Sequence, residues 1–202
     1  KERIVAEVFQ AYERELLRNN AFDFDDLISE TVGLLRAHPE VRARYQKRFR
    51  HLLVDEYQDT NHAQYALIRE FTRPLSDDYA NFDERTGEVL PPAQLTVVGD
   101  SDQSIYAFRG ADIRNITEFE RDFPGAQTIL LEQNYRSTQN ILSGANAVIS
   151  QNPYRPAKNL WTDQGSGELI SIFTGFDERN EAAYVVDQIK QLHSEGTNFR
   201  DI

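Results

Sequence analysis

The stretch Leu52–Thr60 (LLVDEYQDT) decides the predicted fold. A short apolar run that ends abruptly in Asp55 and Glu56 is typical of a buried strand in a parallel sheet, which delivers carboxylates at its carboxyl-terminal edge. The stretch Leu95–Asp100 (LTVVGD) has the same character and also ends in an acid. The sequence therefore predicts two buried strands, each followed by functional groups.

Helical periodicity surrounds these strands. Apolar residues at spacings of three and four predict seven helices. The first three cover 5–16, the stretch from the acidic cluster Asp23, Asp25 and Asp26 to just before Pro39, and 40–50. The others follow Thr60, cover 113–123, and start after Ser137 and Asp177 as capping residues. The stripe expected to be buried in the second helix is Leu27, Thr31, Leu34 and Leu35. Two more strands are expected, at 128–131 and 169–173. Strands alternating with helices predict an α/β fold with a largely parallel sheet.

Composition excludes several classes of protein. The chain has 202 residues, of which 40% are hydrophobic, so one large domain or two small ones can bury a core. Cysteine is absent, which excludes disulfides, a thiol nucleophile and a thiolate zinc site. Neither a membrane-length apolar run nor a signal peptide is present, so we expect a soluble, cytoplasmic protein with no membrane partner. Because the chain starts at Lys1 and has no methionine, we also expect it to be a piece of something longer.

The charge balance argues against a nucleic-acid coat protein, since 22 basic against 33 acidic residues leave a net charge of −11. A local binding groove remains compatible with that balance. The basic residues within 36–50 are most simply interpreted as a solvated helix face; they are Arg36, Arg42, Arg44, Lys47, Arg48 and Arg50. The acidic, proline-rich stretch 73–93 predicts an exposed loop or hairpin, to which we assign no role.

Three segments carry side chains suited to phosphate chemistry. Asp55 and Glu56 could hold Mg²⁺ and polarise an attacking water, or could merely begin a turn. In the segment 97–111, Gly99 allows a sharp turn and Gln103 offers an amide that could sense a terminal phosphate or orient water. The same segment contains Tyr106, Phe108 and Arg109, whose two rings and one cation could stack on bases and bind a phosphodiester backbone. The alternative is that the aromatic rings belong to the core and the arginine lies at the surface.

The third segment is Leu131–Thr138 (LEQNYRST). An arginine between a strand end and a helix start, here Arg136, can neutralise charge on a transferring phosphoryl group, and Tyr135 could stack on a purine. The alternative is a structural arginine paired with a carboxylate.

Together these segments resemble one family. Val54–Asn61 (VDEYQDTN), Val98–Asp112 (VGDSDQSIYAFRGAD) and Leu131–Thr138 are similar to motifs II, III and IV of UvrD/PcrA/Rep-type superfamily 1A DNA helicases, in order. Phe22–Leu27 (FDFDDL) resembles the segment that precedes motif II there. PcrA and UvrD are more similar than the nuclease-linked RecB relatives.

The resemblance implies a partial RecA-like, P-loop-type three-layer α/β/α fold. Residues 1–20 would be the last helix of inserted domain 1B. Residues 21–126 would be the C-terminal part of domain 1A, and residues 127–202 the N-terminal part of domain 2A. Asp25 and Asp26 are interpreted as structural helix caps.

The resemblance also implies roles at an ATP and Mg²⁺ site. Asp55, with Glu56, would hold the metal, and Glu56 would activate the hydrolytic water. Gln103 would contact the γ-phosphate, Arg136 would be the arginine finger, and Tyr135 would pack on the adenine.

Single-stranded DNA would meet Tyr106, Phe108 and Arg109. The family usually has tryptophan where Phe108 stands, so we expect stacking by a smaller ring. The parent would be an ATP-dependent helicase that moves 3′ to 5′ on single strands and unwinds duplex junctions in repair or replication, with repair proteins as further partners.

The family's phosphate-binding loop, G-x-x-x-x-G-K-S/T, and its motifs V and VI are absent from this sequence. We therefore expect the chain by itself to hydrolyse ATP negligibly. Two other hypotheses stay open at this point. One is a non-catalytic module that binds DNA or protein. The other is a metal-dependent phosphoesterase whose ligands would be Asp55, Glu56, Asp100 and Asp102.

Overall fold

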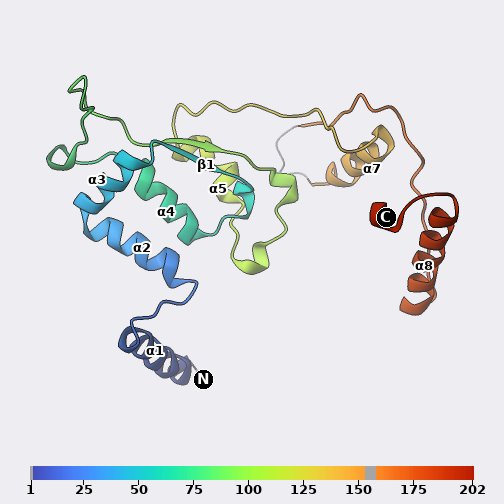
Figure 1. The fold of residues 1–202 in the computed structure, drawn as a ribbon, viewed down its shortest axis with the longest axis horizontal. Coiled ribbons are helices and arrows are strands. Elements are labelled where there is room, and N and C mark those ends of the chain that lie inside the picture. The colour runs from blue at the N-terminus through green and yellow to red at the C-terminus, as the bar shows by residue number, and fades with distance from the viewer. Residues whose placement is uncertain (1, 153–157) are drawn as a thin grey trace. The chain divides into compact units, whose positions relative to one another are not determined.

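The computed structural model describes residues 2–152 and 158–202. The chain divides into an N-terminal unit, residues 1–128, and a C-terminal unit, residues 129–202 (Figure 1). Among the described residues, no helix is long and apolar enough to cross a membrane.

The N-terminal unit is built on a small parallel sheet. Strands β1 (His51–Val54) and β2 (Gln94–Val97) pair in parallel along their whole lengths, from His51 opposite Gln94 to Val54 opposite Val97. The pairing continues past the strand ends, since the Val98 amide donates to the Val54 carbonyl (2.8 Å). The predicted α/β class with a parallel sheet is confirmed, and it is consistent with a partial RecA-like fold. Both carboxyl ends lie at one edge of the sheet.

Three helices pack together beside this sheet. Helices α2 (Asp26–Ala37), α3 (Pro39–Arg48) and α4 (His62–Thr72) contact one another (Figure 1). Leu35 of α2 is 2% exposed, but Leu27 and Leu34 are 56% and 46% exposed, so the predicted buried stripe is wrong for these two. Val32 is buried instead, because helix α2 turns its Val32–Leu35 face toward its neighbours. The first helix, α1 (Glu2–Arg18), has no buried residue.

The helix starts show which predicted caps are used. Asp23 accepts from the Asp26 amide (2.9 Å) and Asp26 accepts from the Asp23 amide (3.0 Å), a reciprocal pair like a capping box. Asp25 precedes α2 but caps nothing with its side chain, so the expectation that it caps is wrong. Helix α4 starts with a full capping box between Asn61 and Gln64 (both bonds 2.9 Å).

In the C-terminal unit, one predicted cap is correct and the other is displaced. Asp177 caps α8 (Glu178–Ser194) by accepting from the Asn180 amide (2.7 Å), as predicted. Helix α7 (Gln139–Ile149) starts after Thr138 rather than after Ser137. The Ser137 amide is already bound by the Asn134 side chain (2.7 Å), which holds Ser137 in the preceding turn.

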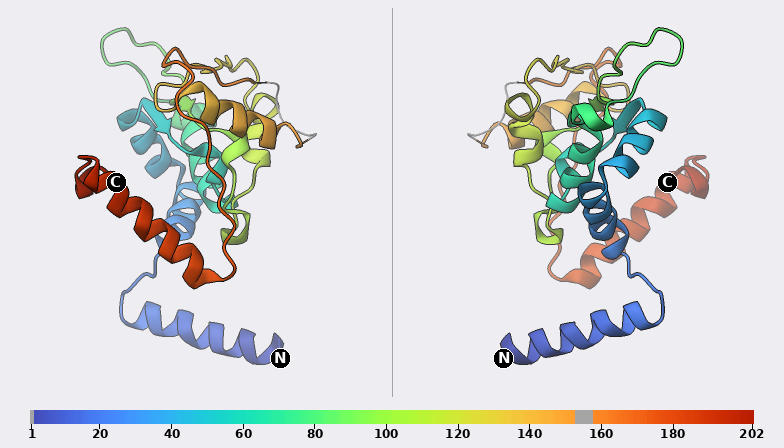
Figure 2. Two further views of the ribbon diagram at one scale, coloured as in Figure 1. Left: turned by 90° about the vertical axis from the view of Figure 1, so that its right-hand side faces the viewer. Right: turned by 90° about the vertical axis from the view of Figure 1, so that its left-hand side faces the viewer.

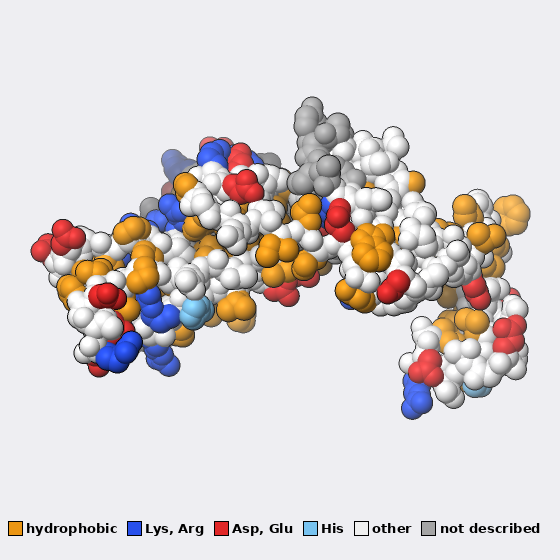
Figure 3. Space-filling model, turned by 90° about the horizontal axis from the view of Figure 1, so that it is seen from above, with side chains coloured by type: hydrophobic (Ala, Val, Ile, Leu, Met, Phe, Trp, Pro, Cys, Tyr) orange, Lys and Arg blue, Asp and Glu red, His pale blue; other side chains and the backbone are white. Residues whose placement is uncertain are grey.

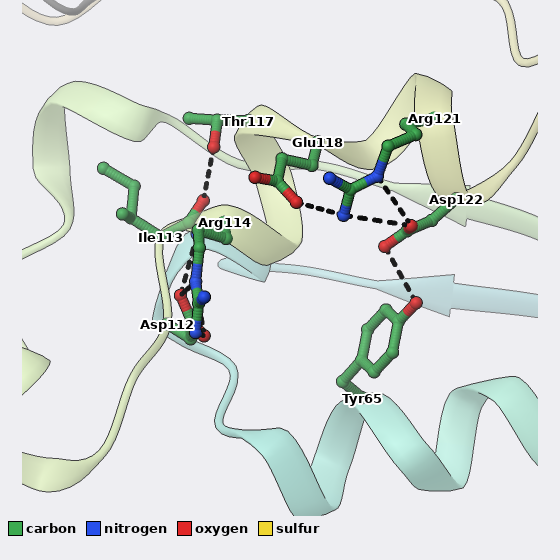
Figure 4. Close-up of polar contacts among 8 residues, drawn as sticks. All are labelled: Tyr65, Asp112, Ile113, Arg114, Thr117, Glu118, Arg121 and Asp122. Atoms are coloured by element: carbon green, nitrogen blue, oxygen red, sulfur yellow. Dashed lines mark hydrogen bonds and ion pairs between the residues drawn. The ribbon is translucent and has the colours of Figure 1, made fainter.

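The helix expected at 113–123 is interrupted. It forms α5 (Arg114–Thr117) and α6 (Phe119–Asp122), with Glu118 between them. The Thr117 hydroxyl donates to the Ile113 carbonyl (3.2 Å), a local bond of the kind that competes with the helix ladder. Figure 4 shows that α6 is joined to α4 where the Tyr65 hydroxyl donates to Asp122 (2.8 Å).

The basic residues of 36–50 do not form only a solvated face. Arg42 is buried, and its guanidinium binds the buried Glu70 carboxylate of α4 (3.3 Å). Arg36 (2.9 Å) and Arg73 (2.7 Å) bind the same carboxylate. The prediction is therefore wrong for Arg42, which is buried. Arg36 is exposed, as predicted, but it binds the same buried anion, which joins α2 and α3 to α4.

Residues 73–93 form a largely exposed loop, as predicted, which projects from the N-terminal unit (Figure 2). Phe82 and Val89 pair across it, which makes its tip a hairpin. Backbone amides donate to Asp83 at the turn and lower the pKa of that carboxyl. Lys47 of α3 pairs with Glu84 (2.6 Å).

The strands predicted at 128–131 and 169–173 are wrong. Both segments are irregular in the structure, and within the described ranges neither pairs with a strand. Their apolar side chains are open to solvent, with Leu131 at 77% and Ile172 at 90% exposure. Figure 3 shows hydrophobic side chains at the surface in several patches. A strand needs ladder partners, and these segments have none there.

Candidate nucleotide and nucleic-acid site

The turn that follows β1 places two carboxylates at the sheet edge. Asp55 and Glu56 are exposed, and the Glu56 amide donates to Asp55 Oδ1 (2.9 Å). Glu56 has φ 49° and ψ 42°, in the left-handed region that residues other than glycine rarely adopt. The Tyr57 amide then donates to the Val98 carbonyl (3.0 Å), which connects the turn to the segment after β2. Such strain persists only where surrounding structure enforces it, and it clusters at functional sites.

A buried amide joins the two strand ends. Gln58 is fully buried, and its Nε2 donates to Glu56 Oε2 (2.7 Å) and to Asp59 Oδ2 (3.2 Å). Its Oε1 accepts from the Asp100 amide (3.0 Å), 42 residues along the chain. The sequence pattern did not predict a role for Gln58, whose only signal is its place within the stretch Leu52–Thr60.

A pocket of about 360 Å³ opens at this edge of the sheet. Its lining residues are Glu56, Gln58, Asp59, Gln103, Ile105 and Tyr106. Two residues predicted to act on ATP, Glu56 and Gln103, therefore share one pocket. The Gln103 side chain is held by a bond from its Nε2 to Asp100 Oδ2 (2.9 Å).

The fit to Mg²⁺ rests on Asp55. Its exposed carboxylate, next in sequence to the pocket-lining Glu56, offers hard oxygen atoms of the kind that Mg²⁺ accepts, and so suits one position in its coordination shell. In residues 2–152 and 158–202 no three His, Cys, Asp or Glu side chains are grouped so that they could hold a metal ion. The carboxylates of Asp55, Glu56, Asp100 and Asp102 thus do not form the ligand set that the phosphoesterase hypothesis requires.

The three residues predicted to meet DNA form one exposed cluster. The rings of Tyr106 and Phe108 lie 6.0 Å apart between centroids. Arg109 Cζ lies 5.0 Å from the centre of the Tyr106 ring and 5.5 Å from that of Phe108, which is cation–π geometry. Phe108 is 79% exposed, so its ring is a surface feature and the alternative of core aromatics does not apply to it. Gly110, at φ 86°, ends this turn with a conformation that favours glycine.

In the C-terminal unit, a short turn presents Tyr135 and Arg136. The Asn134 side chain accepts the amides of Arg136 (2.9 Å) and Ser137 (2.7 Å), and this Asx turn leaves both predicted side chains exposed. The Tyr135 hydroxyl donates to Gln133 Oε1 (2.8 Å). Arg136 pairs with no carboxylate among the described residues. That Arg136 meets Glu56 and Gln103 at one nucleotide stays a prediction.

Tyr57, next to Glu56, is fully buried. Its ring packs edge-on against Phe119 of α6, with centroids 5.6 Å apart. Its hydroxyl has no hydrogen-bond partner within the described part of the chain. Burial raises the pKa of Tyr57 to about 12. Tyr57 therefore packs as a neutral ring that fixes the turn behind the pocket.

Comparison with known proteins gives the family. Residues 1–124 match the UvrD/REP helicase N-terminal domain, and residues 129–202 match the UvrD-like helicase C-terminal domain. This chain belongs to the UvrD/REP helicase family.

Relatives in this family cover almost the whole chain. The chain is 56% identical over 197 residues to the ATP-dependent DNA helicase UvrD1 of Mycobacterium tuberculosis, which is 98% of this chain and 24% of the relative. It is 48% identical over 195 residues to the ATP-dependent DNA helicase PcrA of Bacillus subtilis (96% and 24%), and 46% identical over 200 residues to PcrA of Staphylococcus aureus (99% and 25%). The chain thus spans about a quarter of the length of these UvrD/REP relatives.

Proposed function

We propose that this chain is part of an ATP-dependent DNA helicase and carries central parts of its motor. The observation that carries the proposal is the pocket shared by Glu56, Gln103 and Tyr106, since it joins a carboxylate and an amide to an aromatic residue of the exposed cluster. Family membership supports the same function, because the relatives are named ATP-dependent DNA helicases.

At the pocket, Glu56 would accept a proton from the attacking water, and Gln103 would contact the terminal phosphate. Asp55 would hold Mg²⁺, which when bound neutralises charge on the phosphates. Phosphoryl transfer asks the protein mainly for position and charge neutralisation, which these groups supply in part. Arg136 and Tyr135 of the C-terminal unit would complete the site from the facing domain.

Tyr106 gives the proposal its link between ATP and DNA. It lines the pocket and also packs against Phe108 and Arg109. A change in the pocket that moves Gln103 therefore reaches the exposed rings within the same segment. We propose that these rings stack on the bases of single-stranded DNA and that the parent moves 3′ to 5′ in DNA repair or replication.

The test uses the full-length protein that contains this chain. We expect ATP hydrolysis stimulated by single-stranded DNA, and unwinding of a duplex with a 3′ tail but not of one with a 5′ tail. Glu56→Gln should reduce hydrolysis to a small residual rate and keep nucleotide binding, while the exposed loop variant Glu84→Gln should keep both. If the wild-type protein binds DNA but shows no DNA-stimulated hydrolysis, it is a non-catalytic binding module and the proposal fails.

The isolated 202-residue chain provides a second test. It lacks a phosphate-binding loop, so we propose that it hydrolyses ATP negligibly. A phosphate-release assay with single-stranded DNA should stay at the background rate. Robust turnover by the isolated chain would contradict this part of the proposal.

A further inference from the structure

We infer that Gln58 is a positioning residue that directs the Glu56 carboxylate into the pocket and couples it to the segment after β2. The inference rests on the proposed function, because it assigns Gln58 a task in ATP hydrolysis. It depends on contacts of Gln58 with both strand ends and on the backbone conformation of Glu56.

The hydrogen bonds of Gln58 fix which way its amide points. The Asp100 amide can only donate, so the group that faces it must be Oε1 (3.0 Å). Nε2 then faces Glu56 Oε2 (2.7 Å) and Asp59 Oδ2 (3.2 Å), two acceptors that suit its two N–H groups. A flipped amide would set an oxygen against two carboxylates. Every polar atom of this fully buried side chain therefore has a partner in one orientation only.

Glu56 needs such a partner. Its backbone is left-handed, with φ 49°, and its carboxylate is exposed at the rim of the pocket. A glutamate side chain without a fixed neighbour samples several rotamers, and holding one rotamer costs conformational entropy. The bond from the buried amide selects one direction in advance. A general base must lie within hydrogen-bond reach of the water that it activates, so this direction affects turnover more than nucleotide binding.

The other end of Gln58 connects Glu56 to the DNA-facing segment. Asp100, whose amide Gln58 accepts, also holds Gln103 through Oδ2 (2.9 Å). Tyr106 follows three residues later and lines the same pocket. A displacement of this segment would pull on the amide that aims Glu56. Gln58 is thus placed to make hydrolysis sensitive to the state of the aromatic cluster.

The experiment measures steady-state ATP hydrolysis and nucleotide affinity in the full-length protein. Gln58→Met keeps the length of the side chain and removes the donors and the acceptor. We expect kcat to fall about 10- to 100-fold, the usual effect of losing a partner that orients a reacting group, with nucleotide Kd changed less than about two-fold. The matched control is Gln64→Met, which removes an amide that caps α4 (2.9 Å) outside the pocket and should leave kcat within about two-fold.

Gln58→Glu separates the two ends of the side chain. The glutamate keeps an oxygen for the Asp100 amide but has no donor for Glu56, so kcat should fall as in Gln58→Met. A turnover close to wild type would show that only the bond to Asp100 matters and would overturn the inference. Failure of both variants to fold, judged by melting temperature, would assign Gln58 to the fold and overturn it as well.

A double-mutant cycle gives the decisive comparison. In a Glu56→Gln background, Gln58→Met should lower the residual rate no further, because a positioning residue acts through the group that it positions. A further ten-fold loss would show a separate structural role and refute the inference. Absence of hydrolysis in the wild-type protein would instead defeat the proposed function, so the two failures are distinguishable.

Discussion

Gly99→Ala is the sharpest test of how tightly the two strand ends are joined. A Cβ at Gly99 would lie 2.7 Å from Gln58 Oε1, 2.9 Å from Ile116 Cδ1 and 3.2 Å from the Tyr57 backbone nitrogen. Gln58 cannot retreat, because it is buried and bonded at both ends. Overpacking costs about 1–3 kcal/mol, and one broken hydrogen bond adds about 1 kcal/mol. We therefore expect Gly99→Ala to lower the unfolding free energy by about 2–4 kcal/mol.

The assay is urea unfolding of the 202-residue chain, followed by far-ultraviolet circular dichroism. The matched control is Gly33→Ala in the interior of α2, where a Cβ would have nothing within 4 Å. Alanine is the better helix former, so this change should stabilise the chain by about 0.5–1 kcal/mol. Equal effects of the two substitutions, or a Gly99→Ala variant within about 0.5 kcal/mol of wild type, would refute the close packing described here.

Three further predictions concern the N-terminal unit. Glu70→Gln leaves the buried Arg42 charge without its anion and should lower the unfolding free energy by about 3 kcal/mol in the same assay. Its control, Glu84→Gln, removes an exposed ion pair and should change the unfolding free energy by less than about 1 kcal/mol. The pKa of Tyr57 is raised from 10.0 to about 12, so the unfolding free energy should fall as pH rises through that interval. Tyr57→Phe should weaken this alkaline dependence, to which Tyr65 also contributes, and cost little stability at pH 7, since the hydroxyl has no partner in the described structure. Phe108→Ala should weaken binding of single-stranded DNA to the full-length protein by about 1–3 kcal/mol, measured by fluorescence anisotropy, and an unchanged affinity would remove Phe108 from the DNA site.

The local parts of this fold could be predicted from the sequence because local chemistry determines them. The apolar runs that end in Asp55 and Asp100 became β1 and β2, and Asp177 caps α8 as its position suggests. The exposed ring of Phe108 beside Arg109 also follows from neighbouring residues. For the Asp177 cap and the Phe108 ring the partners lie within a few residues of one another, so spacing alone carries the information.

Contacts between distant residues could not be predicted in this way. The sequence does not show that Arg36 and Arg42 both bind Glu70, which lies 34 and 28 residues further along. Gln58 looks like an ordinary polar residue because its acceptor role depends on Asp100, 42 residues away. A single sequence does not show which of many acids or amides will be the neighbour.

The segments 128–131 and 169–173 show the same limit for strands. Their apolar, β-branched composition resembles that of β1, yet β1 is a strand because β2 lies beside it and accepts and donates along its whole length. Composition supplies a side chain that suits a sheet, whereas the ladder requires a second backbone in register. Glu56 makes the converse point, since nothing in a glutamate favours φ 49°. Its amide donates to Asp55, its carbonyl accepts from the Asp59 amide, and the following Tyr57 amide donates to Val98, so the surrounding turn holds it there. The backbone conformation of Glu56 thus could not be predicted from its own residue type, because it depends on how the ends of the two strands are joined.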